Sequence, residues 1–119
     1  QGIIKDVYRL TKLRMYEHDL KQVGMLDYFM IDNRDTRQKI LTATIYISHK
    51  WQGEAVNTTG TRPTWFDFNQ IPYSDMTDDC REWLPKILDG DKIIVEVYSK
   101  LDPISQNELI QEVLIRSIL

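Results

Sequence analysis

The pattern of apolar and polar positions predicts a helix at the start of the chain. From Gly2 to about Val23, apolar residues recur every three or four positions, as on the buried face of an amphipathic helix. Gly24 is a natural stop for this helix. The apolar run Met25–Ile31 is too short to assign, and residues 32–35 indicate a turn or loop.

Three segments are typical of β-strands. The clearest is Ile40–Ser48, where β-branched residues are frequent and charges are few. Its apolar residues fall on both faces, which is typical of a strand covered on both sides in a parallel sheet. Thr64–Phe68 predicts a shorter strand after a loop over residues 51–62, and Ile93–Tyr98 predicts a third strand.

A second helix is expected between Thr77, a suitable N-cap, and Gly90. Pro85 lies inside this pattern and is expected to kink the helix or split it. Cys80 is expected to be a small, half-buried residue of this helix rather than a nucleophile.

A third helix is expected at the end of the chain, running to Leu119. Ser105–Glu108 forms a capping box, in which the serine and glutamate side chains each satisfy a free backbone N–H. Ile104 and Leu109 occupy the positions of a hydrophobic staple. The resulting order of strands and helices predicts a parallel α/β sheet.

One connection does not fit this architecture easily. Only about a dozen residues separate Trp51 from Thr64, and a parallel crossover usually needs at least that many, including a helix. Either the crossover is unusually short, or a piece has been lost, or these two strands are not neighbours.

The composition indicates one ordinary globular domain. The chain has 119 residues, of which 42% are hydrophobic and 28% charged. A net charge of −3 gives no reason to expect a nucleic-acid partner, and no apolar run approaches the length of a membrane span. The single cysteine excludes an internal disulfide, so we expect a cytoplasmic protein without a membrane partner. The start at Gln1 is typical of a piece of something longer.

Candidate chemistry begins at Ser48-His49-Lys50-Trp51, at the end of the clearest strand. Ligand crevices in open α/β sheets lie at the carboxyl ends of strands. His49 could transfer a proton or bind a ligand, and Trp51 could supply a stacking face. Local packing of both residues is the alternative interpretation.

Two further places carry polar groups of interest. Asp67, inside an aromatic strand, needs a partner such as His49 or Lys50, or a polar ligand. Asn69 and Gln70 open a segment that ends at Tyr73 and is either a simple turn or a contact surface.

Glu112 is not explained by the capping box, so it is either a catalytic carboxylate or part of a solvated helix face. Gly-rich phosphate loops, nucleophile elbows and zinc or calcium motifs are absent from the sequence, and no metal site is expected.

In this order, Ile45–Trp51, Trp65–Pro72 and Ile93–Ser99 resemble the strands of TIR-like domains. The match is to a divergent branch with an SHRW-like first strand and a W-x-D-x-x-x-x-P second strand, and it covers about residues 41–119. The resemblance implies a small flavodoxin-like parallel sheet flanked by helices. It divides the chain into an N-terminal helical extension, residues 1–39, and a TIR-like core, residues 40–119.

The resemblance also implies function. Such domains self-associate in signalling or defence, and some cleave the nicotinamide–ribose bond of NAD. Glu112 aligns with the glutamate of the cleaving members, although the Trp-Cys pair that precedes it there is absent. NAD would then be a substrate rather than a prosthetic group, held by Ser48, His49, Trp51, Asp67, Asn69 and Gln70.

Two other functions stay open. The same surfaces could serve only as a protein interaction module, or the domain could be a structural α/β part of a larger protein.

Overall fold

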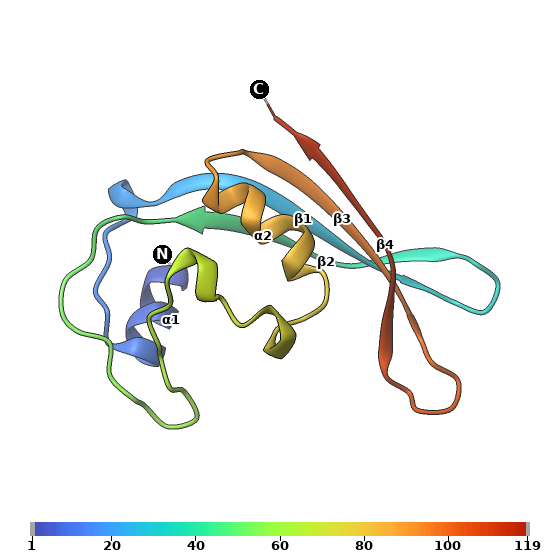
Figure 1. Cartoon of the computed structure of the whole chain (residues 1–119), viewed down its shortest axis with the longest axis horizontal. Helices are drawn as coiled ribbons and strands as arrows, with labels where there is room; N and C mark the ends of the chain where they lie inside the picture. Colours follow the sequence, from blue (N-terminus) through green and yellow to red (C-terminus); the bar gives the residue numbers. More distant parts are fainter. Residues whose placement is uncertain (1, 119) are drawn as a thin grey trace. The chain divides into compact units, whose positions relative to one another are not determined.

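A computed structural model describes residues 2–118; Gln1 and Leu119, which end the predicted ranges, lie outside the described residues. Three short 3₁₀ turns accompany the helices and strands, at Glu17–Asp19, Phe68–Gln70 and Tyr73–Asp75. In chain order (Figure 1), the main elements are α1 (Gly2–Thr11), β1 (Lys21–Ile31), β2 (Arg37–Ile47), α2 (Cys80–Leu88), β3 (Ile93–Leu101) and β4 (Glu108–Ser117).

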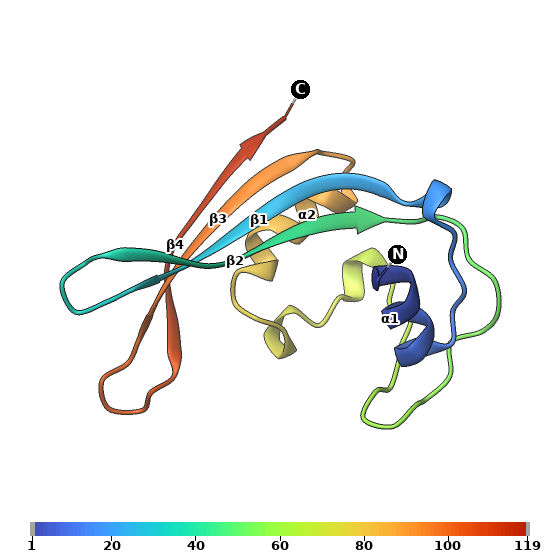
Figure 2. The same ribbon diagram turned by 180° about the vertical axis from the view of Figure 1, so that it is seen from behind.

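The four strands form one mixed sheet in the order β2-β1-β3-β4. Only β1 and β3 run parallel, whereas β3 and β4 are antiparallel. Figure 2 shows that β1–β2 and β3–β4 are hairpins closed by short loops. The predicted flavodoxin-like parallel sheet is therefore wrong. Both hairpins place consecutive strands side by side with opposite directions, which a sheet of helical crossovers does not allow.

Contacts divide the chain into two compact units. The first contains residues 2–22 and 46–71, and the second contains residues 23–45 and 72–118. The second unit holds most of the sheet and α2, and the first holds α1 and the long connection between β2 and the 3₁₀ turn at Phe68–Gln70. The domain boundary predicted between residues 39 and 40 stays a prediction.

The first hairpin confirms the turn predicted at residues 32–35. Asp32 Oδ1 accepts hydrogen bonds from the backbone N–H groups of Arg34 at 2.8 Å and Thr36 at 2.9 Å. The unassigned run Met25–Ile31 is part of β1, and the strand predicted over Ile40–Ser48 is confirmed as part of β2, which ends at Ile47. The apolar residues on both faces of β2 therefore belong to a hairpin and not to a parallel strand.

The predicted C-terminal helix is wrong, because this segment is strand β4. Asp102 organises the hairpin loop: its Oδ1 accepts from the backbone N–H of Ile104 at 3.1 Å, and its Oδ2 from the Ser105 hydroxyl at 2.8 Å. The Ser105 hydroxyl in turn accepts from the N–H of Asn107 at 3.3 Å. Ile104 is 94% exposed, so the hydrophobic staple does not form. The capping residues are used in a turn, and β4 gains a ladder with β3 that is interrupted only by an irregularity between Tyr98 and Ser99.

Two other predicted elements differ from the structure. The N-terminal helix ends at Thr11 instead of Val23, and Lys12 follows with a φ of 65°. Thr64–Phe68 is not a strand, because the chain there is irregular and then enters the 3₁₀ turn, where the Gln70 N–H donates to the Asp67 carbonyl at 2.9 Å. Neither change was visible in the local apolar pattern.

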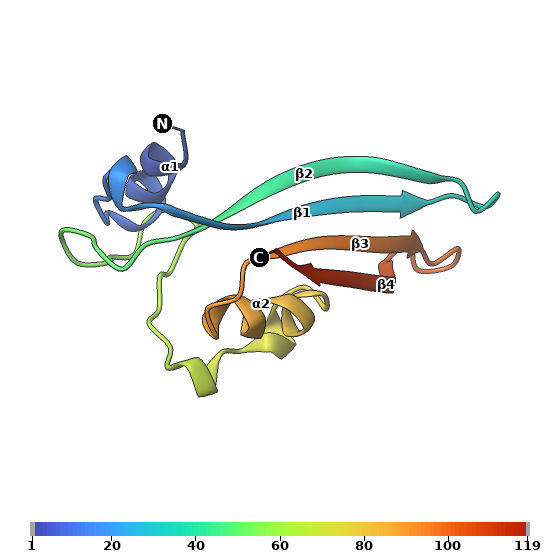
Figure 3. The same ribbon diagram turned by 90° about the horizontal axis from the view of Figure 1, so that it is seen from above.

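The helix predicted between Thr77 and Gly90 is confirmed as α2, which continues through Pro85. It covers one face of β3, as Figure 3 shows. On that face Ile93, Val95 and Val97 are completely buried, which confirms the third predicted strand as the centre of the core. Full burial of each such side chain contributes about 1.5–3 kcal/mol.

Candidate functional site

Asp79 is the most unusual polar residue of the second unit. It immediately precedes α2 and is only 3% exposed. Its Oδ2 accepts a hydrogen bond from the indole Nε1–H of Trp83 at 2.9 Å, one helical turn further on. Its Oδ1 is buried and has no hydrogen-bond partner among the described residues. A buried carboxylate oxygen without a donor is costly, so its retention points to a role beyond packing.

Asp79 interacts with a side chain of α2 and acts electrostatically on a side chain of β1. Tyr28 of β1 lies on the same sheet face as Val97, its partner in the ladder, and Ser99 of β3 lies further along that face. Burial raises the pKa of the Tyr28 hydroxyl above its ordinary value, and the negative charge of Asp79 is the next cause; hydrogen bonding with Ser99 acts in the opposite direction. The carboxylate and the phenol are therefore close enough to interact. We call Tyr28, Asp79, Cys80, Trp83 and Ser99 the Asp79 cluster.

Two other groups of the cluster have hydrogen-bond partners in neighbouring residues. The fully buried Ser99 hydroxyl lies 3.5 Å from the Phe29 carbonyl, to which it donates. The Cys80 thiol lies 3.3 Å from the Thr77 hydroxyl, which confirms the expected helix position of this cysteine but shows it more buried than expected. Chemically, the cluster offers Oδ1 of Asp79 as a buried acceptor without a partner among the described residues, and it contains the half-buried aromatic side chain of Tyr28.

The predicted ligand residues Ser48, His49 and Trp51 lie in the first unit, just after β2. His49 and Trp51 line an open pocket of about 600 Å³; its other lining residues are Tyr16, Asp19, Lys50 and Gln52. The Ser48 hydroxyl is used locally: it donates to the Lys50 carbonyl at 2.8 Å and accepts from the Lys50 N–H at 3.2 Å. The structure thus brings two of these three residues into one pocket.

Asp67, Asn69 and Gln70 lie together at the second 3₁₀ turn, and all three are exposed. No ion pair within 4.0 Å joins Asp67 to His49 or Lys50 among the described residues. The aromatic strand that was expected to hold Asp67 is absent, so this carboxylate faces solvent and needs no buried partner. A ligand role for the three residues stays a prediction.

Glu112 lies on β4, opposite Tyr98 in the ladder, and is exposed. Its alignment with a catalytic glutamate assumed a helix that the structure replaces with a strand. Its catalytic role stays a prediction without that support.

The sequence missed the Asp79 cluster. Asp79 fell within the segment expected to form the second helix and was not singled out there, and Tyr28 fell in the unassigned run. One available signal was the spacing of Asp79 and Trp83, because residues four apart meet on one helix face. What the spacing does not reveal is that Asp79 is buried.

Two general features complete the description. Within residues 2–118, no three histidine, cysteine, aspartate or glutamate side chains come together as a metal site would require. No helix in the described chain has the length and apolar composition that a membrane-crossing helix needs.

No family model matches this sequence. The chain is similar to the oxidized purine nucleoside triphosphate hydrolase of Danio rerio, with 28% identity over 69 residues. The match covers 58% of this chain and 42% of the relative, so the chain spans less than half the length of that protein. This likeness and the mixed sheet together show that the resemblance to TIR-like domains is wrong. That resemblance rested on the order of three short motifs.

Proposed function

We propose that this chain recognises the purine base of a nucleotide, with Asp79 as the group that reads the base. The observation that carries the proposal is the buried Oδ1 of Asp79, which has no hydrogen-bond partner among the described residues; the charge of this carboxylate acts on the hydroxyl of Tyr28. The likeness to a protein named for its action on oxidised purine nucleoside triphosphates supports this choice of ligand. The chemistry on the phosphates is proposed only for the complete protein, and we assign no residue of this chain to it.

The chemistry of the base matches the free acceptor. The edge of guanine carries adjacent N–H donors, and oxidation of a purine at the imidazole carbon converts a ring nitrogen from acceptor to N–H donor. A carboxylate oxygen accepts such a donor well, and a hydrogen bond to a charged group contributes about 1.5–3 kcal/mol. A site whose buried polar group needs a donor rejects ligands that lack one.

Two neighbours of Asp79 support the same function. The indole N–H of Trp83 donates a hydrogen bond to Oδ2 and holds the carboxylate in one orientation. Oδ1 is therefore left as the acceptor for a ligand. The ring of Tyr28 is partly exposed and can stack on a base, an interaction that contributes about 1–3 kcal/mol.

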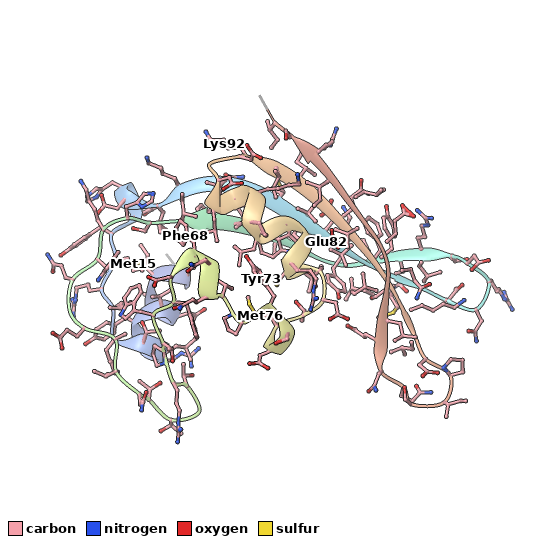
Figure 4. All side chains as sticks on the ribbon, in the orientation of Figure 1. Met15, Phe68, Tyr73, Met76, Glu82 and Lys92 are labelled. Carbon is pink, nitrogen blue, oxygen red and sulfur yellow. The ribbon has the colours of Figure 1, made fainter. Side chains whose placement is uncertain are left out.

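Access to Asp79 requires movement of the side chains that cover it. Residues 72–78 lead directly into α2, are mostly exposed, and contain no regular structure except the 3₁₀ turn at Tyr73–Asp75. Figure 4 shows Tyr73 and Met76 on this segment. Segments with few buried contacts open most easily, so we propose that this one moves aside when the base enters.

Isothermal titration calorimetry tests the proposal. The protein is titrated with guanosine monophosphate, its 8-oxo form and uridine monophosphate. We expect both purine nucleotides to bind more tightly than the pyrimidine. Asp79→Asn keeps the size of the side chain and an oxygen for Trp83, but presents an amide N–H to the base. It should weaken purine binding about tenfold or more.

Asp78→Asn is the matched control, because Asp78 is adjacent, carries the same charge and is exposed. It should leave purine binding unchanged. Equal binding by the wild type and Asp79→Asn, or no purine binding by the wild type, would contradict the proposal. TIR-type signalling, self-association and cleavage of NAD followed from the resemblance alone; they stay predictions and are not part of this proposal.

A further inference from the structure

The pocket after β2 is built by two segments of the first unit that are held together by the backbone. Arg14 and Gln52 exchange two hydrogen bonds, from the Arg14 N–H to the Gln52 carbonyl at 2.9 Å and from the Gln52 N–H to the Arg14 carbonyl at 2.8 Å. The Tyr16 hydroxyl donates to Gln52 Oε1 at 3.2 Å, which leaves the side-chain NH₂ of Gln52 as a donor. The two sides of the pocket are therefore fixed relative to each other.

Trp51 supplies an aromatic surface to this pocket. Its ring stacks on Trp65, with centroids 5.1 Å apart and an interplanar angle of 30°, and it remains 43% exposed. Trp65 does not line this pocket, whereas Trp51 does. A planar ring entering the pocket can stack on the exposed part of the Trp51 indole, which is a favourable arrangement for aromatic groups.

The exposed charge in the pocket is positive. The Lys50 ammonium has no carboxylate within 4.0 Å among the described residues, and the turn that carries it is pinned by both hydrogen bonds to Ser48. The only carboxylate of the pocket, Asp19, is mostly covered and lies 3.6 Å from Nε2 of His18. An anion can therefore approach Lys50, and the amide of Gln52 and the imidazole of His49 offer further hydrogen bonds.

The geometry points to a second ligand site in this pocket, for a phosphorylated aromatic compound whose ring stacks on Trp51 and whose phosphate contacts Lys50. The pocket volume of about 600 Å³ is in the range of small-molecule sites. The site belongs to the first unit and uses no residue of the Asp79 cluster, so it does not rest on the proposed purine recognition.

Three probes separate the contributions of ring and phosphate: 1-naphthyl phosphate, 1-naphthol and inorganic phosphate. The first carries no N–H donor, so it cannot satisfy Oδ1 of Asp79. Measured by quenching of tryptophan fluorescence and by titration calorimetry, 1-naphthyl phosphate should bind more tightly than either of the other probes. Its affinity should fall with added salt, because the Lys50 contact is screened.

Lys50→Gln should weaken binding of 1-naphthyl phosphate about threefold, as expected for an exposed ion pair, and leave that of 1-naphthol unchanged. Lys5→Gln is the control, because Lys5 is an exposed lysine of α1 in the same unit that does not line the pocket. Trp51→Leu should weaken binding of both aromatic probes about tenfold. Trp51→Phe keeps an aromatic ring and should retain most of the affinity. It serves as the control in case the leucine variant misfolds.

Asp79→Asn separates this site from the proposed purine site. It should leave the affinity for 1-naphthyl phosphate unchanged whether or not it weakens purine binding. The inference is overturned if 1-naphthyl phosphate binds no more tightly than 1-naphthol, if Lys50→Gln binds it as the wild type does, or if a folded Trp51→Leu does so.

Discussion

Trp83 donates its indole N–H to Oδ2 of Asp79 at 2.9 Å, and this bond joins the residue before α2 to the first turns of the helix. Asp79 makes no side-chain hydrogen bond to the backbone at the helix end, although aspartate commonly caps helices there. The carboxylate is directed to a side chain instead, and its second oxygen is left without a donor.

We expect the hydrogen bond between Trp83 and Asp79 to stabilise the folded protein. Trp83→Phe removes the only donor to a buried carboxylate and should lower the free energy of unfolding by about 1–3 kcal/mol. Asp79→Ala leaves only a half-buried indole N–H without its acceptor, so it should cost less than Trp83→Phe. Urea denaturation measures both changes, with the exposed Asp78→Ala as a control near zero. If Trp83→Phe is as stable as the wild type, the bond does not hold the carboxylate.

Gly24 marks a close approach of the two parallel strands. A Cβ atom at this position would lie 2.7 Å from the backbone carbonyl oxygen of Ile93, so the backbones of β1 and β3 would have to shift. Gly24→Ala should lower the free energy of unfolding by about 1–3 kcal/mol, as overpacking does. Gly2→Ala, where no atom lies within 4 Å, should be neutral or slightly stabilising. Thermal denaturation of both variants tests the contrast, and equal melting temperatures would contradict it.

We expect the fold to lose stability in alkaline solution because Tyr98 becomes deprotonated there. Its hydroxyl donates to Glu96 Oε2 at 2.6 Å, and this hydrogen bond, followed by burial, raises the pKa of Tyr98 above its ordinary value. The pKa of Tyr28 is raised as well. A raised pKa stabilises the fold below the pKa of an unfolded tyrosine, about 10, and the stabilisation disappears as the pH rises through the folded-state pKa.

The free energy of unfolding of the wild type should therefore fall above about pH 10. In Tyr98→Phe this fall should be smaller, whereas Tyr8→Phe, at an exposed tyrosine of α1, should keep it. Urea denaturation across this pH range, together with tyrosinate absorbance, provides the measurement. An identical alkaline slope in Tyr98→Phe and the wild type would show that the Glu96 bond does not act in this way.

We expect Asp102 to give the opposite pH dependence, a loss of stability in acid. Hydrogen bonds from the backbone of Ile104 and the hydroxyl of Ser105 lower the pKa of this carboxyl below its ordinary value of 3.8. A lowered pKa stabilises the hairpin above that value, and the contribution is lost as the pH falls through the folded-state pKa. Asp102→Ala should therefore lower the melting temperature at neutral pH and have little effect once the carboxyl is protonated. A deficit of the same size in acid would rule out this origin.

The elements that the sequence predicted well are those whose local pattern and tertiary role agree. The turn after β1 follows from Asp32, whose side chain binds two backbone N–H groups within the loop itself. The strand at Ile93–Tyr98 follows from a run of β-branched residues that is also the most buried part of the sheet. The second helix follows from its apolar spacing and from Gly90, which adopts the positive φ that favours glycine.

The elements that were predicted wrongly are those where two local structures, a helix and a strand, compete for the same residues. Ser105–Glu108 satisfies the local rules for a helix start, but Asp102 takes the Ser105 hydroxyl and the chain turns into a hairpin. Leu109 and Ile110 then pair with Lys100 and Ser99 of β3, across the hairpin loop. A capping box is worth little beside a complete strand ladder, because local propensity is a weak preference that tertiary contacts override.

The sequence by itself determined the turn after β1, the strands at Ile40–Ile47 and Ile93–Tyr98, and α2, because hydrogen bonds and burial within a few residues settle those choices. Only the tertiary structure decided the direction of the strands, the strand character of β4 and the environment of Asp79. The first two depend on the pairing of whole strands, and the last on groups distant in the chain such as Tyr28, whose hydroxyl is acted on by the Asp79 charge.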